Sequence, residues 1–130
     1  MRDLLEVGRV GLFVAVVLVP CPSRPNCVST EARDPGHRMP AISFRGSVEN
    51  AQTRLRRILG ELPRASITAD RPGYLAASFR SRLFGFVDDA EFILDSNRKE
   101  IRFRSGARTG YYDFGVNRSR MESIARAFKE

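Results

Sequence analysis

The spacing of apolar residues changes along the chain and separates helical from extended segments. Between Ser47 and Gly60 apolar residues recur at helical spacing, which predicts a helix capped by Ser47 and stopped by Gly60 and Pro63. A second helical stripe predicts a helix over residues 118–128, with Asn117 or Ser119 as its cap. Between the helices the period falls to two, which predicts strands near residues 66–70, 74–81, 85–95 and 100–105.

The turn at Asn97 and Arg98 fixes the register of the last two strands. Centring the hairpin on this turn pairs apolar residues on one face and opposite charges on the other. A slip of one residue would place Leu94 against Arg102, so we expect this register or one shifted by two residues. The expected pairs are Leu94 with Ile101, Phe92 with Phe103, and Glu91 with Arg104.

Together these elements predict an α+β fold. The expected order is β-α-β-β-β-β-α, a twisted antiparallel sheet of about four to five strands with two helices packed on one face. The first strand is short and centres on Ile42 and Phe44. We expect three parts along the chain: an apolar leader over residues 1–20, an irregular Cys- and Pro-rich arm over 21–46, and the α+β domain over 47–130.

The apolar run from Val10 to Val19 predicts export from the cytoplasm. It is shorter than the about 20 residues that span a membrane and matches the core of a secretory signal. Asp3 and Glu6 reduce the positive charge that precedes such a core, so a retained membrane anchor is the alternative. The segment before Cys21 resembles a lipoprotein cleavage box, but Pro20 stands where a small residue is needed. We expect a periplasmic or membrane-anchored envelope protein.

The chain has only two cysteines, Cys21 and Cys27. In an oxidising compartment they would close a small proline-containing loop, and this disulfide is the leading interpretation. Free thiols are the second alternative, and redox or metal chemistry is the third. A redox pair is more typically spaced as CxxC, and a zinc site would find only His37 as an obvious further ligand. We therefore predict no metal and no cofactor.

The formal net charge of +7 and the pI near 10.4 indicate a surface that attracts polyanions or anionic lipid. The arginines are spread along the chain and interleaved with acidic residues. A nucleic-acid-binding protein more often carries a compact basic stripe or a recognisable motif, and neither is present. We expect no nucleic acid among the partners.

Asp88 is the exceptional member of the expected core face of its strand. A buried carboxylate needs a partner, and Arg108 or Arg118 is the expected one. A polar network that fixes the loop over residues 106–116 against the sheet is the leading interpretation of the charged residues here. Its predicted members are Asp88, Asp89, Glu91 and Asp113, with Asn117 and the nearby arginines, whereas the rest of the core face of the strand is Phe86, Ala90, Phe92 and Leu94.

Two functional hypotheses start from the same region. In a binding module, arginines near the start of the last helix would hold a phosphate or carboxylate of an anionic envelope lipid, an envelope polymer or an acidic protein. Its candidate residues are Arg104, Arg108, Arg118 and Asn117. The alternative is a hydrolase that uses Asp88, Asp89 or Glu91 as acid and base. Adjacent strand residues point to opposite faces, and no nucleophile motif is present, so the sequence favours a non-catalytic structural or binding role.

Three segments go beyond generic packing and carry a family resemblance. They are CPSRPNCVS at residues 21–29, FVDDAEF at 86–92, and RSGAR at 104–108 leading into DFGVNR at 113–118. In this order and spacing they resemble the family called domain of unknown function 1499, from Cys21 to about Phe128. The resemblance implies a small bacterial envelope protein, often with a signal or lipoprotein leader, and no assigned activity or catalytic residue. Here the apolar leader directly abuts Cys21, which departs from the usual pattern.

Overall fold

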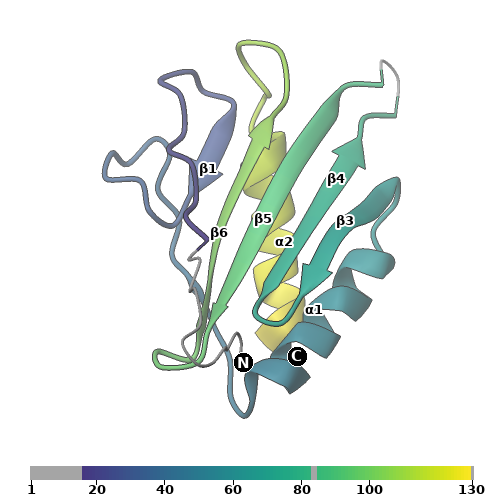
Figure 1. The fold of residues 1–130 in the computed structure, drawn as a ribbon. Helices are drawn as coiled ribbons and strands as arrows, with labels where there is room; N and C mark the ends of the chain where they lie inside the picture. Colours follow the sequence, from purple (N-terminus) through teal and green to yellow (C-terminus); the bar gives the residue numbers. More distant parts are fainter. Residues whose placement is uncertain (1–15, 83–84, 130) are drawn as a thin grey trace.

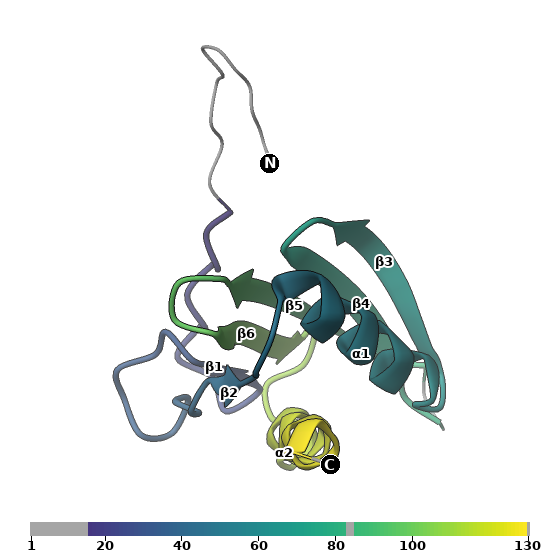
Figure 2. The same ribbon diagram turned by 90° about the horizontal axis from the view of Figure 1, so that it is seen from below.

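Six strands and two helices make up the described part of the chain, residues 16–82 and 85–129 of a computed structural model. Both helices cover the same face of one antiparallel sheet (Figures 1 and 2). The predicted α+β class is therefore confirmed, with one strand more than expected. In chain order the elements are β1 (Cys27–Ser29), β2 (Ile42–Ser43), α1 (Val48–Gly60), β3 (Ala65–Arg71), β4 (Tyr74–Arg80), β5 (Val87–Asp95), β6 (Glu100–Ala107) and α2 (Val116–Lys129).

The outer edge of β6 receives two short strands from the arm. The strand order is β1-β6-β5-β4-β3, and β2 also pairs with β6. Val28 of β1 lies opposite Ser105, and Ile42 of β2 lies opposite Ile101. The sequence pattern missed β1, because three residues are too few to show a period and their hydrogen-bond partners come from the far end of the chain. The observed order is β-β-α-β-β-β-β-α.

The predicted register of the last hairpin is confirmed. Leu94 lies opposite Ile101, and Glu91 lies opposite Arg104. The Asp95 carboxylate accepts hydrogen bonds from the backbone N–H groups of Asn97 and Arg98 at 2.9 and 3.1 Å, which stabilises the turn. Local turn chemistry and the cross-strand pattern therefore specify the same alignment.

The core lies between the sheet and the two helices. Ser47 caps α1 as expected, since its hydroxyl accepts a hydrogen bond from the Asn50 N–H at 3.0 Å. Burial of each large apolar side chain contributes roughly 1.5–3 kcal/mol to folding. The large apolar side chains that are most completely buried are Phe92, Phe103, Leu75, Ile101, Leu55, Leu59, Met121 and Ile124.

Two predicted boundaries are wrong. Phe86 precedes β5 rather than joining its core face, and it is 58% exposed. Gly85, with a φ of 67°, turns the chain just before the strand begins. The second helix begins at Val116, so neither Asn117 nor Ser119 is its cap. The Asp113 carboxylate accepts hydrogen bonds from the backbone N–H groups of Gly115 and Asn117 instead.

The expected leader falls mainly on residues 1–15, which lie outside the described residues. Residues 16–20 have no regular secondary structure. Leu18 is buried, whereas Val17 and Val19 are exposed. Within residues 16–82 and 85–129, every helix is too short or too polar to cross a membrane.

Candidate functional site

The disulfide between Cys21 and Cys27 closes a loop that packs against the end of β6. Asn26 buries its side chain there and donates a hydrogen bond from Nδ2 to the Gly110 carbonyl at 2.7 Å. Its own carbonyl accepts one from the Ala107 N–H at 2.9 Å. The approach is close: a Cβ on Gly106 would lie 3.0 Å from the Cys27 sulfur. The loop therefore has a fixed place on the sheet.

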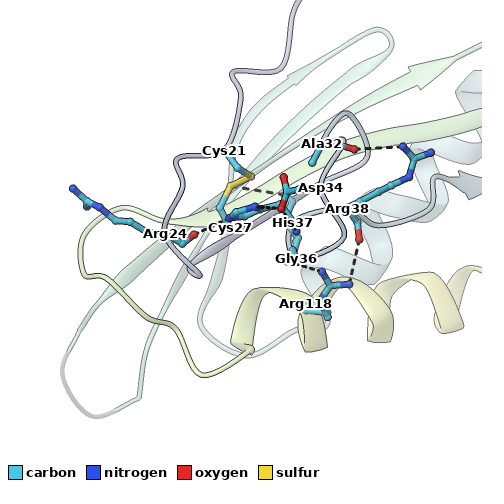
Figure 3. Close-up of polar contacts among 10 residues, drawn as sticks. Cys21, Arg24, Cys27, Ala32, Asp34, Gly36, His37, Arg38 and Arg118 are labelled. Carbon is cyan, nitrogen blue, oxygen red and sulfur yellow. Dashed lines mark hydrogen bonds and ion pairs between the residues drawn. A yellow bond between two sulfur atoms is a disulfide. The ribbon is translucent and has the colours of Figure 1, made fainter.

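His37 connects this loop to the turn over residues 34–38, which follows β1 (Figure 3). Nδ1 lies 2.6 Å from the Asp34 carboxylate, and Nε2 lies 2.9 Å from the Arg24 carbonyl. Both partners are acceptors, so both ring nitrogens must carry a proton for both bonds to form. The carbonyl of Arg24 raises the pKa of His37 most, and Asp34 adds to this against the opposing effect of burial. We infer that His37 is a cation when the two bonds are in place.

Arg118 reaches from α2 to the same turn (Figure 3). Its guanidinium donates to the Gly36 carbonyl at 3.0 Å and to the Arg38 carbonyl at 3.3 Å. These contacts use two of its five N–H groups. The positive charge of Arg118 also opposes the rise in the pKa of His37, which places the two cations within electrostatic reach of each other.

A hollow of about 160 Å³ opens where the disulfide loop, the turn and the start of α2 meet. Arg118 supplies a cationic wall. Asp113 is also present, but its carboxylate accepts hydrogen bonds from the N–H groups of Gly115 and Asn117 at 2.9 and 3.1 Å. The full lining is Pro25, Cys27, Val28, Gly36, Tyr112, Asp113, Gly115 and Arg118. The hollow can accept a small polar group that approaches the arginine.

Asp88 does lie on the core side of β5, and its partner is Arg120. The two side chains meet at 3.0 Å and are 14% and 16% exposed. The prediction of Arg108 or Arg118 as the partner is therefore wrong. Helical spacing could have found the partner, because Arg120 lies beside the buried Met121 and Asn117 on the stripe of α2 that faces the sheet.

Asn117 is fully buried at the centre of this polar network. Its Nδ2 donates to the Asp113 carboxylate at 2.9 Å, and its Oδ1 accepts from the Ser105 hydroxyl at 2.7 Å and from Arg120 at 3.1 Å. These bonds satisfy the side chain within the protein. Asn117 therefore joins β6 to α2 and has no surface to offer a ligand.

A family model described as "Protein of unknown function (DUF1499)" matches residues 17–128. The chain belongs to the DUF1499 family. No curated protein and no solved structure matches the chain. The three segments that suggested this family meet in the fold: Cys27 lies opposite Gly106 across β1 and β6, Asp89 lies opposite Gly106 across β5 and β6, and the Asp113 N–H donates to the Pro25 carbonyl at 3.3 Å.

The predicted arginine trio of this DUF1499 chain is divided between separate places. Arg108 makes two hydrogen bonds to Asp89, at 2.9 and 2.7 Å, in an exposed ion pair. Arg104 points to the sheet face away from the helices, where its buried Nε has no hydrogen-bond partner among the described residues. Arg118 projects from α2, which covers the other face. Of the three, Arg118 alone lines the hollow.

The predicted carboxylates also have separate partners in this DUF1499 chain. Asp88 and Asp89 point to opposite faces and contact different arginines. Glu91 lies opposite Arg104 in the register, but it accepts a hydrogen bond from the Tyr74 hydroxyl at 2.5 Å. Burial first, and this bond second, raise the pKa of Tyr74 to about 12. Within the described residues, no three His, Cys, Asp or Glu side chains are grouped to hold a metal ion.

Proposed function

We propose that this DUF1499 chain is a non-catalytic binding module of the cell envelope that holds a phosphate or carboxylate group in the hollow beside Arg118. The observation that carries the proposal is the position of Arg118 on the wall of the hollow. A guanidinium that keeps unused N–H groups suits a planar or tetrahedral oxyanion.

Two other residues of the predicted site support this choice, because each is already engaged within the protein. Arg108 is neutralised by Asp89, and Asn117 is buried among protein partners. An internal anion already lies at the N-terminus of α2, because the Asp113 carboxylate accepts from the N–H groups of Gly115, just before the helix, and of Asn117 within it. An incoming anion would therefore bind through the side chain of Arg118 rather than through the helix dipole.

The disulfide supports an envelope location. Disulfides persist in oxidising compartments and are rare in the cytosol of most cells. The apolar run before Cys21 independently predicts export. The ligand we propose is accordingly an anionic group of an envelope lipid, of an envelope polymer or of an acidic protein, all of which present phosphate or carboxylate oxygens.

Amide chemical-shift titration tests the proposal. Inorganic phosphate and acetate are added separately at constant ionic strength, and the backbone amides of Gly36, Gly115 and Arg118 are followed by nitrogen-edited NMR. We expect a saturable shift of these three signals with at least one anion. The Arg118→Gln variant should bind at least tenfold more weakly, a change of about 1.4 kcal/mol.

Two further variants separate binding from folding. Arg118→Lys keeps the positive charge but loses the planar guanidinium and its paired N–H donors, so it should retain part of the affinity for the anion. Arg126→Gln removes a charge from the exposed side of the same helix and should bind as the parent does. An unchanged affinity in the Arg118→Gln variant, or shifts spread evenly over the protein, would show that this site is wrong.

A further inference from the structure

Three aromatic side chains protrude from the loop between β6 and α2. The exposed fractions are 68% for Tyr111, 56% for Tyr112 and 82% for Phe114, and Val116 follows them at 46%. The rings of Tyr112 and Phe114 pack together with their centres 4.7 Å apart. Single exposed apolar residues are ordinary, but several exposed aromatic residues on one loop, two of them in contact, favour an interaction surface.

The loop between β6 and α2, which we call the aromatic loop, is fixed to the disulfide loop and has a strained backbone at Phe114. The Gly110 carbonyl accepts a hydrogen bond from the Asn26 side chain, and the Asp113 N–H donates one to the Pro25 carbonyl. These two bonds tie the aromatic loop to the disulfide loop. Phe114 has a φ of 56°, a left-handed conformation that is unfavourable for a bulky residue. Its ring does not gain burial in return, since it is the most exposed of the three. Backbone strain of this kind concentrates at sites of function.

The same end of the sheet is basic. We define the loop end as residues 22–26, 81–82, 85–86 and 108–115, which lie along the end of the sheet where β4 and β6 finish (Figure 1). Arg24 and Arg82 are exposed there without an ion-pair partner among the described residues. Asp113 is the one acidic residue of this set, and its oxygens accept hydrogen bonds from the protein. The loop end therefore combines positive charge with exposed aromatic rings.

We propose that the loop end docks on the surface of an anionic phospholipid membrane. The rings of Tyr111, Tyr112 and Phe114 would lie at the level of the headgroups, where aromatic side chains are enriched in membrane proteins. Arg24 and Arg82 would face the lipid phosphates. Exposed aromatic rings and arginines at one end of the sheet complement the interfacial region and the charged headgroups of an anionic membrane. This proposal stands on observations other than the hollow and holds even if the hollow binds no anion.

A tryptophan reporter tests which end meets the membrane. The chain contains no tryptophan, so Phe114→Trp gives a single fluorophore at the loop end. Asn97→Trp gives the matched control in the β5–β6 turn at the other end of the sheet (Figure 1). Each full-length variant is mixed with vesicles of phosphatidylglycerol and phosphatidylethanolamine, with and without brominated acyl chains. We expect a blue shift and quenching by bromine for the Phe114→Trp variant only.

Charge variants test the electrostatic part. Replacing Arg24 and Arg82 together by Gln should weaken binding to the anionic vesicles roughly thirtyfold, as expected for two arginines near an anionic surface. Replacing Arg45 and Arg98 by Gln removes the same charge at the other end and should have a much smaller effect. Phosphatidylcholine vesicles should bind the parent chain more weakly than anionic ones.

The reporter also distinguishes docking from insertion of the apolar run. If the Phe114→Trp variant binds vesicles with no change in its fluorescence, the N-terminal segment alone attaches the chain, and the proposal fails. Equal quenching of both reporters would mean unspecific adsorption and would also overturn it. A blue shift of the Phe114→Trp variant without vesicles, together with a dimer in sedimentation, would assign the aromatic loop to a second copy of the chain instead.

Discussion

Asp88 on β5 and Arg120 on α2 form an ion pair that joins the sheet to the C-terminal helix at 3.0 Å. The guanidinium also lies 4.2 Å from the centre of the Phe79 ring and donates to Asn117. Both charged groups are mostly removed from water, so each depends on the other for compensation. The neighbouring pair of Asp89 and Arg108 lies on the opposite face and is exposed.

The two adjacent pairs should respond very differently to loss of the carboxylate. Asp88→Leu leaves Arg120 buried without a counter-charge and should lower the free energy of unfolding by about 3 kcal/mol. Asp89→Leu breaks a solvated pair and should cost less than about 1 kcal/mol. Urea denaturation measures both values.

A double variant separates the cost of an orphaned charge from the value of the pair. Asp88→Leu combined with Arg120→Met should recover much of the stability lost in either single variant, because no buried charge then lacks a partner. If the reductions in the free energy of unfolding of the two single variants simply add in the double variant, the ion pair does not couple α2 to the sheet.

Gly106 and Gly60 should respond in opposite ways to alanine. A Cβ on Gly106 would lie 3.0 Å from the Cys27 sulfur and 3.2 Å from its Cβ, so Gly106→Ala should lower stability by about 1–3 kcal/mol. Gly60 ends α1 with open space around it, and Gly60→Ala should raise stability by about 0.4–1 kcal/mol. Thermal unfolding measures both. A neutral Gly106→Ala would show that the disulfide loop shifts without cost.

His37 should make stability depend on pH near neutrality. The pKa of His37 is raised above 6.5 in the folded protein. Its stabilising effect is therefore complete at pH values below the pKa of the unfolded chain, and it is lost as the pH rises through the pKa of the folded protein. The pKa of Asp34 is lowered, mainly by the hydrogen bond with His37, so its contribution is lost only when pH falls below about 3.8. The contact therefore contributes fully from about pH 4 to about pH 6.5.

The measurement for His37 is direct, because the chain has one histidine. NMR titration of its ring protons should give a pKa above the usual value of about 6.5. The urea midpoint of the parent should fall between about pH 6 and about pH 9, whereas the His37→Gln variant should show a flatter profile over this range. A ring pKa below about 6.5 would contradict the double hydrogen bond to Asp34 and Arg24.

The candidate site shows where sequence reasoning succeeded and where it failed. Alternation along β5 correctly placed Asp88 toward the core, because a strand fixes the side of each residue locally. The partner was wrong, since the choice among Arg108, Arg118 and Arg120 depends on how α2 rotates against the sheet. Alternation along β6 likewise puts Arg104 on the face away from the helices, whereas the contacts of Arg118 depend on how α2 packs. A pattern within one element carries no information of this kind.

By itself the sequence determined the local order of this protein. Stripes of apolar residues predicted the two helices, and the turn with its apolar and charged cross-strand pairs predicted the β5–β6 register. The two cysteines were identified as candidates for a disulfide. Tertiary structure alone decided that residues 27–29 form an edge strand on β6, that Arg120 compensates Asp88, and that Arg118 borders a hollow. The physical reason is range. Helical and strand periods arise from neighbouring residues, whereas edge pairing, buried charge compensation and cavities depend on contacts between segments about 30 to 80 residues apart in the chain.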